Sequence, residues 1–353
     1  MSETVLDQAG NVRPEEALDI KTLSDYLSAS IPNFEGITEL RQFPGGYSNL
    51  TYLIKTPHRE FVLRKPPRGA KIKSAHDMKR EYHVLTLLQP VYKKMPSPFV
   101  YCEDESVIGA PFFVMERVSG IILRHTPPKN LHLNADAFKR LSTNCLLNLV
   151  DLHNLELQKS QLITLGNPDG YVARQVSGWI ERYFKAETDS IMGMNTAAEW
   201  LQSNQPKTSA TAFIHNDYKY DNLVLDENTL EIKAVLDWEM ATIGDPLMDL
   251  GTTLAYWVEA QDHPALRAFN LTWVKGNLTR EQFIQTYAKL RAVDVDAILF
   301  YYVFGCFKIG VIGQQIYARY QKGFTKDARF ANLIYVVKAC ADNAQKAIKD
   351  KRI

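Results

Sequence analysis

The stretch TAFIHNDYKYDNLVLD, residues 211–226, places a dense polar cluster between two apolar runs. The runs AFI and LVL have the length and composition of short buried strands. Between them lie a histidine, aspartates, a lysine and asparagines within eight positions. Solvation explains a polar surface loop, but it does not explain ionisable groups fixed at the end of a strand. The pattern therefore predicts a site at which several polar side chains meet.

The next stretch, EIKAVLDWEMATIGDPLMDLG at residues 231–251, supplies a partner strand. A hairpin with its turn centred between Thr229 and Leu230 pairs Asn222 with Asp237, and the same register pairs Asp226 with Lys233. Such a hairpin holds one amide oxygen and one carboxylate at its open end. Mg²⁺ prefers oxygen ligands and takes few of them from protein. We therefore predict that Asn222 and Asp237 are magnesium ligands.

Asp217 and Lys219 precede Asn222 by five and three residues. A carboxylate at position 217 is placed to accept a proton from an attacking hydroxyl, while the lysine neutralises a transferring phosphoryl group. Phosphoryl transfer requires mainly positioning and charge stabilisation. We predict that Asp217 and Lys219 are the catalytic residues, and a solvated surface lysine is the alternative for Lys219.

The composition of the 353 residues limits the partners of the chain. Its 41 Lys+Arg and 40 Asp+Glu residues give a net charge of +1, so nothing favours nucleic acid or an anionic membrane. Four widely spaced cysteines form no CxxC pair and indicate reduced thiols in a cytoplasmic protein. The polar N-terminus has no signal peptide pattern. The most apolar stretch, residues 297–307, falls short of the ~20 residues of a membrane span and predicts a buried helix.

Sequence patterning predicts an α+β chain. Residues 49–56 and 60–65 read as a hairpin, residues 74–90 as a helix and residues 110–120 as another strand. From about residue 134 the chain is predominantly helical. A β-rich lobe at residues 1–118 and a helical lobe at residues 119–353 follow from this order.

Several motifs resemble one family. HNDYKYDN reproduces the H-x-D-x-x-x-x-N loop of the protein-kinase-like superfamily, and LDWE stands where those enzymes carry D-F-G. With GDPLMDL, the pattern is similar to the aminoglycoside phosphotransferase/choline kinase-like family. More narrowly, it resembles the kinase-like domain associated with acyl-CoA dehydrogenases, over residues 40–323. The resemblance implies a bilobal protein-kinase-like fold, with an antiparallel sheet and a helix in the N-lobe and a mostly helical C-lobe.

The resemblance also implies a site for Mg²⁺ and for ATP or GTP. The segment PGGYSNLTYLI takes the place of a glycine-rich phosphate loop, although it lacks G-x-G-x-x-G. Arg64 matches the lysine that contacts the nucleotide phosphates, with Lys65 as an alternative, and Glu81 matches its ion-pair partner. The nucleotide-binding residues implied in this way are Gly45, Gly46, Ser48, Arg64, Glu81 and Glu116.

The acceptor is expected to be a small hydroxyl compound. Six residues separate Glu239 from Pro246, which leaves no room for the activation segment that docks a peptide in protein kinases. Residues 251–353 carry 15 Lys+Arg against 8 Asp+Glu, a net of +7, whereas polycationic aminoglycosides require an acidic pocket. Lys308 interrupts an apolar helix, where a charge is costly without a partner. We hypothesise an anionic hydroxyacyl thioester or hydroxy acid, contacted by Lys308 with Arg174 or Arg319; Trp179 and Glu239 are further acceptor candidates.

Some roles stay open at this point. A non-catalytic, nucleotide-binding regulatory (pseudokinase) module is the alternative function, favoured by Arg64 and the missing G-x-G-x-x-G; an aminoglycoside-resistance kinase is another. Glu239 either contacts a second Mg²⁺ or caps a turn. His215, Asp245 and Asp249 are expected to brace the catalytic loop. The sequence leaves the oligomeric state open.

Overall fold

The computed structural model describes residues 9–43, 49–67, 77–126, 131, 133–207, 209–325 and 328–353. The predicted phosphate-loop residues Gly45, Gly46 and Ser48 lie outside this part of the chain. The chain divides into two compact units. The first comprises residues 1–122 and 223–241, and the second comprises residues 123–222 and 242–353.

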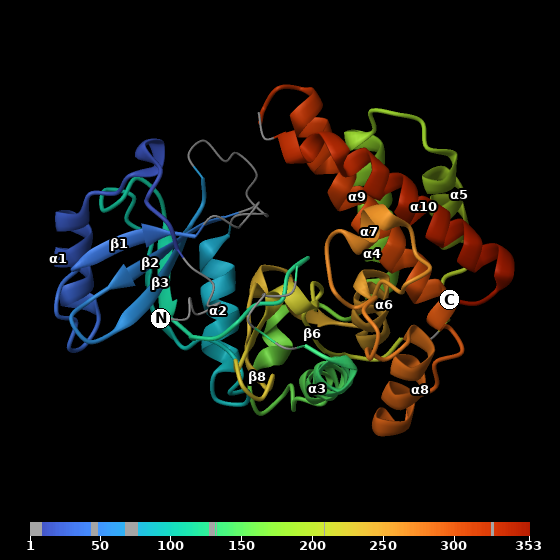
Figure 1. The fold of residues 1–353 in the computed structure, drawn as a ribbon, viewed down its shortest axis with the longest axis horizontal. Helices are drawn as coiled ribbons and strands as arrows, with labels where there is room; N and C mark the ends of the chain where they lie inside the picture. The colour runs from blue at the N-terminus through green and yellow to red at the C-terminus, as the bar shows by residue number, and fades with distance from the viewer. Residues whose placement is uncertain are drawn as a thin grey trace. The chain divides into compact units, whose positions relative to one another are not determined.

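The first unit is built on a five-stranded antiparallel sheet in the order β1-β2-β3-β5-β4, of which β1, β2 and β3 are labelled in Figure 1. The predicted hairpin at residues 49–65 is confirmed, with Leu50 opposite Lys65 and Lys55 opposite Glu60. The elements of this unit are η1 Pro14–Glu16, α1 Ile20–Ser30, β1 Glu39–Gln42, β2 Leu50–Lys55, β3 Glu60–Lys65, α2 Met78–Leu88, β4 Pro98–Cys102, β5 Phe112–Glu116, β7 Leu223–Leu225, β8 Ile232–Val235 and η4 Trp238–Met240.

The alternation of side chains along β3 decides which helix each residue meets. Phe61 and Leu63 point to one face of the sheet and pack in a core with Leu23 and Leu27 of α1. Arg64 lies on the opposite face, and its side chain contacts Glu81 of α2. The pleat of β3 therefore directs one basic side chain toward the helix α2.

The β7–β8 hairpin exists, but the predicted register was wrong, by one residue at Leu223 and Val224 and by two at Leu225. Leu223 lies opposite Val235, and a bulge after Val224 then brings Leu225 opposite Ile232. Asp226 and Lys233 are consequently not a cross-strand pair. The extra residue on β8 has no strong sequence signal, because bulges are set by local packing.

The hairpin explains why residues 223–241 join the first unit, although the sequence placed them in the C-terminal lobe. Leu225 forms an antiparallel bridge with Ile121, and the Val235 amide donates to the Lys94 carbonyl at 2.8 Å. The boundary at residues 122/123 lies four residues beyond the predicted one at 118/119.

The second unit is predominantly helical, as predicted, and the α9 and α10 helices run alongside each other in it (Figure 1). Two short strands, β6 and β9, pair next to residues 215–222, the predicted catalytic loop. The elements are α3 Ala135–His153, η2 Leu162–Leu165, α4 Tyr171–Ala186, α5 Met192–Ser203, β6 Ala212–Ile214, η3 Tyr220–Asn222, β9 Thr242–Gly244, α6 Pro246–Tyr256, α7 Pro264–Arg267, α8 Arg280–Arg291, α9 Ile298–Gln321, η5 Ala328–Asn332 and α10 Leu333–Asp350.

Helix α9 contains the apolar stretch that the sequence assigned to a buried helix, and this assignment is confirmed. The helix continues past Lys308 to Gln321, so by length and composition alone it could cross a membrane. However, 78% of its most apolar window is buried within the protein, as expected for a core helix. Its aromatic residues are buried in the core; they are Phe300, Tyr301, Phe304 and Phe307.

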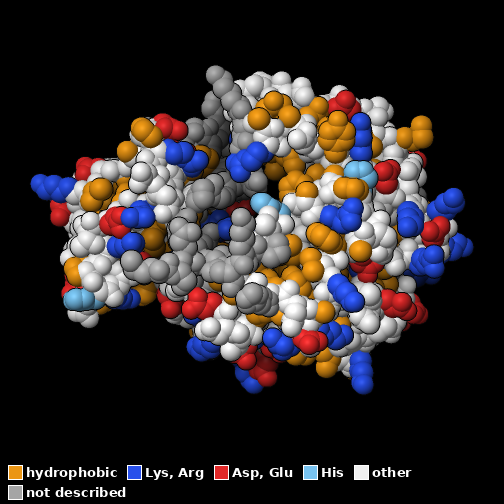
Figure 2. Space-filling view, in the orientation of Figure 1, with side chains coloured by type: hydrophobic (Ala, Val, Ile, Leu, Met, Phe, Trp, Pro, Cys, Tyr) orange, Lys and Arg blue, Asp and Glu red, His pale blue; other side chains and the backbone are white. Residues whose placement is uncertain are grey.

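Figure 2 shows both acidic and basic side chains scattered over the visible surface, in keeping with a net charge of +1. The four cysteines are free thiols, as the sequence predicted, and the structure shows that they are buried.

Candidate active site

In the first unit, a buried ion pair joins β3 to α2. Arg64 Nη1 donates to Glu81 Oε1 at 2.6 Å. The two side chains are 11% and 1% exposed. Lys65 points elsewhere, because its ammonium donates to the Ile108 carbonyl at 3.0 Å. Of the two basic residues that the sequence offered, Arg64 is therefore the partner of Glu81.

The same guanidinium faces two further carboxylates. Arg64 Nη2 donates to Asp237 Oδ1 at 3.1 Å, and Glu239 Oε2 lies 3.7 Å from it. Burial lowers the pKa of Arg64, but Glu81, Asp237 and Glu239 outweigh burial and raise it above its ordinary value. Burial raises the pKa of Glu81, and the contact with Arg64 opposes that rise. The arginine therefore stays charged among three acidic groups.

This surplus of negative charge fits a divalent cation. Three carboxylates share one guanidinium, and Asp237 and Glu239 remain 34% and 24% exposed, so their oxygens are accessible. Asp237 also adopts a left-handed backbone conformation, with φ +66°. Such strain in a residue other than glycine is concentrated at functional sites. Within the described part of the chain, no three His, Cys, Asp or Glu side chains form a metal site by themselves. Mg²⁺ needs no such set when water and phosphate complete its shell.

Glu239 has a second partner that sequence patterns did not reveal. The Asn49 side-chain amide donates to Glu239 Oε2 at 2.8 Å, across 190 positions of sequence. Asn49 is 3% exposed and belongs to the segment predicted as the phosphate loop, next to Ser48 in sequence. This contact ties the start of β2 to the segment that carries Asp237.

Glu116, a predicted nucleotide-binding residue, lies at the end of β5. Its carboxylate accepts from the Ser97 amide at 3.1 Å, and its own amide donates to the Ser97 carbonyl at 2.8 Å. These contacts close the end of the β4–β5 pair. A role for Glu116 in nucleotide binding stays a prediction.

In the second unit, Asp217, Lys219 and Asn222 form one cluster. Lys219 Nζ lies 3.1 Å from Asp217 Oδ2. The Asn222 amide nitrogen donates to the backbone oxygen and to Oδ2 of Asp217, each at 2.9 Å. With its nitrogen directed at Asp217, Asn222 presents its amide oxygen as the atom that can ligate a cation. The predicted catalytic pair is thus brought together with one of the two predicted metal ligands.

Asp217 is kept ionised by its surroundings. Burial alone would raise the pKa of this carboxyl group. Lys219, the Tyr256 hydroxyl, His215 and Lys308 outweigh burial and hold the pKa of Asp217 below its ordinary value. An ionised carboxylate can accept a proton, which is the requirement for a general base.

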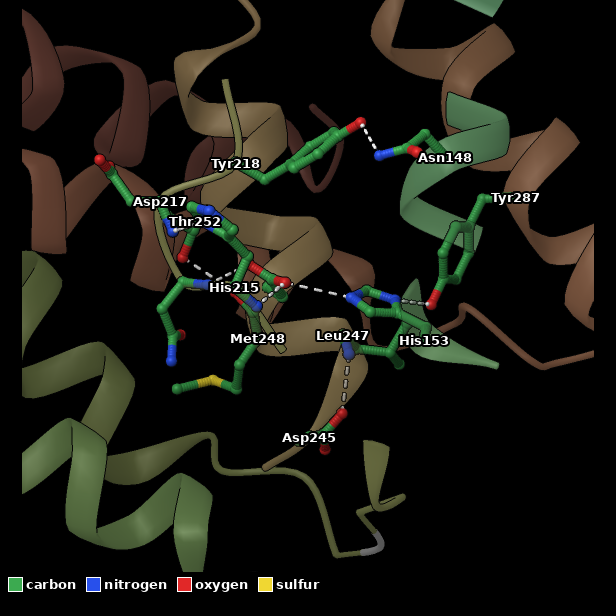
Figure 3. Close-up of polar contacts among 12 residues, drawn as sticks. Asn148, His153, His215, Asp217, Tyr218, Asp245, Leu247, Met248, Thr252 and Tyr287 are labelled. Carbon is green, nitrogen blue, oxygen red and sulfur yellow. Dashed lines mark hydrogen bonds and ion pairs between the residues drawn. The ribbon is translucent and has the colours of Figure 1, made fainter. Parts of the chain in front are cut away.

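The backbone of the catalytic loop is held by Asp249 of α6. Its carboxylate accepts from the amides of His215 and Asn216 at 2.7 and 2.8 Å. The Asp217 amide in turn donates to His215 Nδ1 at 3.2 Å. The bracing roles expected for His215 and Asp249 are confirmed. Asp245 instead accepts from the Leu247 amide at 2.8 Å and caps α6 (Figure 3).

Behind Asp249, His153 of α3 extends this network. His153 Nε2 donates to Asp249 at 3.1 Å, and the Tyr287 hydroxyl lies 2.6 Å from Nδ1 (Figure 3). Burial lowers the pKa of His153 and outweighs the opposing effect of Asp249. The ring is therefore neutral, with Nδ1 accepting from Tyr287. His153 was missed from the sequence, because a histidine within a helix has no distinctive local pattern.

The acceptor candidates Lys308 and Trp179 contact each other. Lys308 Nζ lies 5.6 Å from the centre of the Trp179 ring, and the Arg182 guanidinium lies 4.9 Å from the same ring. Arg174 donates instead to the backbone carbonyls of Asn167 and Asp169, which precede α4. Arg319 is in the last turn of α9, eleven positions or roughly 16 Å of helix beyond Lys308. Roles for these residues in acceptor binding stay predictions.

Tyr256, the last residue of α6, is a further residue that the sequence did not indicate. Its ring centre lies 4.8 Å from Lys219 Nζ, and its hydroxyl contributes to lowering the pKa of Asp217. The sequence signal for Tyr256 is its position on the helix that begins with GDPLMDL, because this helix carries the residue to Lys219 of the catalytic loop.

Comparison with known proteins identifies relatives over most of the chain. Residues 39–293 match the model of the phosphotransferase enzyme family. The chain is 34% identical over 322 residues to acyl-CoA dehydrogenase family member 10 of Mus musculus, covering 90% of the chain and 30% of that protein. It is 33% identical over 322 residues to acyl-CoA dehydrogenase family member 11 of Gallus gallus, covering 88% of the chain and 41% of that protein. The chain thus spans less than half the length of these curated relatives.

Solved structures share the fold. A candidate aminoglycoside phosphotransferase from Ralstonia eutropha superposes with a TM-score of 0.77 at 27% identity, covering 94% of this chain and 99% of that one. Choline kinase from Cryptosporidium parvum gives a TM-score of 0.62 at 14% identity, covering 94% and 97%. An aminoglycoside phosphotransferase with AMP-PNP and hygromycin B gives 0.59 at 14% identity, covering 92% and 98%. The kinase-like α+β fold is confirmed, and the chain belongs to the phosphotransferase enzyme family.

Proposed function

We propose that this protein is a Mg²⁺-dependent kinase that transfers the γ-phosphoryl group of ATP to a hydroxyl of a small acceptor. The observation that carries the proposal is the state of Asp217. This carboxylate is partly buried, at 14% exposure, and its surroundings hold its pKa below the ordinary value; Lys219 lies 3.1 Å from it and the Asn222 amide 2.9 Å. A base at the end of a braced loop is what hydroxyl phosphorylation requires.

In the proposed step, the acceptor oxygen forms a bond to the γ-phosphorus while the bond from that phosphorus to the β,γ-bridging oxygen breaks. The bridging oxygen leaves with the electron pair as part of ADP, and the hydroxyl proton moves to an Asp217 oxygen. Lys219, adjacent to Asp217, stabilises the negative charge of the transferring group. Asp249 and His215 keep the loop backbone fixed, so that little reorganisation accompanies the step.

The donor is proposed to be ATP because a solved neighbour holds AMP-PNP and another holds ADP. Arg64, oriented by Glu81, is the proposed phosphate contact of the first unit. Its planar guanidinium can bind phosphate oxygens in a bidentate manner. Asn222 and Asp237 would hold Mg²⁺, which when bound neutralises phosphate charge. These two residues flank the β7–β8 hairpin, one before its first paired residue and the other two positions after its last.

The acceptor is proposed to be an anionic hydroxyacyl thioester or hydroxy acid. Lys308 and Arg182 both lie against the Trp179 ring, so two cations surround this aromatic group of the catalytic unit. A polycationic acceptor would be repelled by such a pair. The curated relatives carry the name acyl-CoA dehydrogenase, which points to acyl-CoA chemistry in the same proteins. Free buried cysteines support a cytoplasmic location.

A non-catalytic nucleotide-binding module is the second candidate, and Arg64 favours it. Arg64 stands where the family pattern has a lysine, and its guanidinium already contacts the carboxylates of Glu81, Asp237 and Glu239. A module of that kind would bind ATP and never produce ADP.

The test is ADP formation with purified protein, ATP and MgCl₂ across hydroxyacyl-CoA thioesters, free hydroxy acids, choline and hygromycin B. We expect turnover with the anionic compounds. Asp217→Asn should lower kcat by about 10²–10⁴-fold and leave ATP binding intact in a thermal-shift assay. Asp151→Asn, on the exposed face of α3, is the matched control and should behave as wild type. ATP binding without turnover on any acceptor would instead support the non-catalytic module.

A further inference from the structure

We propose that the buried ammonium of Lys308 is a positioning group for the catalytic base: it fixes the Asn216–Asp217 peptide, and it does so in its charged form. The inference deepens the proposed function and rests on it for the identity of the base. Sequence patterning suggested an acceptor contact for Lys308, whereas the structure shows which atom its ammonium already contacts.

Lys308 lies in the middle of α9 and is 2% exposed. Its Nζ donates to the Asn216 carbonyl oxygen at 2.6 Å, with both groups buried. Hydrogen bonds from a charged donor are shorter and roughly twice as strong as neutral ones. A lysine that merely extended to solvent would make no such contact, so the side chain has a specific partner.

The contact completes the fixation of one peptide plane. The Asn216–Asp217 peptide has its carbonyl on Lys308 and its N–H on His215 Nδ1, at 2.6 and 3.2 Å. The preceding peptide has its N–H on Asp249 at 2.8 Å. Rotation about either side of the Asn216 Cα would break one of these bonds. The direction in which the Asp217 side chain leaves the backbone is therefore set from α9 and α6 together.

The conformation held in this way is a strained one. Asn216 has φ +67°, in the left-handed region. A residue other than glycine in such a region costs of order 1–3 kcal/mol and persists only where the surroundings impose it. Lys308 and Asp249 contact the backbone on the two sides of this residue, and the Tyr171 hydroxyl contacts its side chain at 3.1 Å, so these groups together hold the conformation. Removing the Lys308 contact should let the loop relax toward ordinary backbone angles.

The charge of Lys308 is balanced by groups on several elements. Burial lowers its pKa; Asp217 and Asp249 raise it, and Lys219 and Arg182 lower it further. The pKa of Lys308 is consequently lowered to about 8 from 10.5. The folded protein therefore buries the charged ammonium of Lys308, although its surroundings favour the neutral amine more than water does. A position that costs stability and orients the base is expected to be functional.

The depressed pKa predicts two opposite pH trends. Between pH 8 and 10.5 the unfolded chain binds more protons at Lys308 than the folded chain does, so this residue makes folding stability rise with pH. Over the same range the ammonium becomes a neutral amine, and its bond to Asn216 weakens. Global stability and loop order should thus diverge as pH rises, which a purely structural lysine would not produce.

The experiment measures amide hydrogen exchange of residues 215–218 in the full chain, for wild type, Lys308→Met, Lys308→Arg and Lys338→Met. Lys338 is an exposed lysine on α10 and provides the matched control. We expect Lys308→Met to accelerate exchange of these amides at least tenfold at pH 7, with no decrease in the global free energy of unfolding. Lys308→Arg should restore protection, and Lys338→Met should match wild type.

A second measurement covers the case in which Lys308→Arg does not fold. Amide exchange of residues 215–218 in wild type is compared at pH 7 and pH 9.5, after correction for intrinsic rates. At pH 9.5 the protection of these amides should fall toward the level of Lys308→Met. Equal protection in wild type and Lys308→Met at both pH values would overturn the proposal, as would a uniform loss of stability throughout the chain. Neither readout needs an acceptor, so failure of the proposed kinase activity would leave this result independent.

Discussion

Glu81 accepts a hydrogen bond from the Arg64 guanidinium at 2.6 Å, and the two side chains are almost fully withdrawn from solvent. A buried pair of this kind adds little net stability, because desolvation offsets the attraction. Removing one partner is destabilising, because the other partner is left as an uncompensated buried charge. The pair therefore identifies a position at which charge is retained for orientation rather than for stability.

Glu81→Gln should lower the free energy of unfolding by about 2–3 kcal/mol, because the glutamine keeps an acceptor oxygen but loses its charge opposite Arg64. Urea denaturation followed by circular dichroism measures the change. Glu60→Gln, exposed on the same β3 strand, should change stability by less than about 0.5 kcal/mol. Identical midpoints for Glu81→Gln and wild type would contradict the role of the ion pair.

Asp249→Asn should loosen the catalytic loop. The two carboxylate oxygens accept from the His215 and Asn216 amides, and an asparagine offers only one oxygen to these donors. One buried N–H is then left without a partner, at a cost of about 1–3 kcal/mol. Hydrogen exchange at residues 215 and 216, together with urea denaturation, reports both effects. Asp151→Asn serves again as the control, and unchanged exchange at both amides would disprove the bracing role.

His153 should make the protein less stable in acid. Its pKa is lowered by burial, so below about pH 6.5 the unfolded chain binds a proton that the folded chain does not. The free energy of unfolding should therefore fall as pH decreases from 7 toward 5. His153→Gln should flatten this dependence, whereas His83→Gln, exposed on α2, should preserve it. A slope equal to wild type in His153→Gln would rule out the assignment.

The local chemistry of the catalytic loop was predictable because it resides in a short contiguous pattern. Asp217, Lys219 and Asn222 lie within six positions of each other, so spacing alone brings them together. Helix α1 could also have been predicted from the sequence, although it was missed. Asp19 accepts from the amides of the first helical turn, and Leu23 and Leu27 follow at helical spacing.

Contacts between distant positions were not predictable from a single sequence. Asn49 meets Glu239 across 190 positions, and Lys308 meets the Asn216 carbonyl across 92. A backbone carbonyl is present at every residue, so nothing in the sequence marks the partner of a lysine of this kind. The hairpin register failed for a similar reason, because the bulge after Val224 depends on packing rather than on turn residues.

The close packing of α6 on α9 leads to the last prediction, which concerns the support of Asp249. A Cβ added at Gly251 would overlap the Tyr301 backbone carbonyl, whereas one added at Gly313 would lie at an ordinary 3.4 Å from the Val337 side chain. Gly251→Ala should therefore destabilise the protein by about 1–3 kcal/mol or more, because a rigid backbone must move. Gly313→Ala should be neutral or stabilising by up to about 1 kcal/mol, since alanine favours a helix. Thermal unfolding of both variants measures the difference.

Because Gly251 lies two residues after Asp249, hydrogen exchange at His215 and Asn216 should rise in Gly251→Ala alone. Equal stability of the two variants would show that the helices separate without cost.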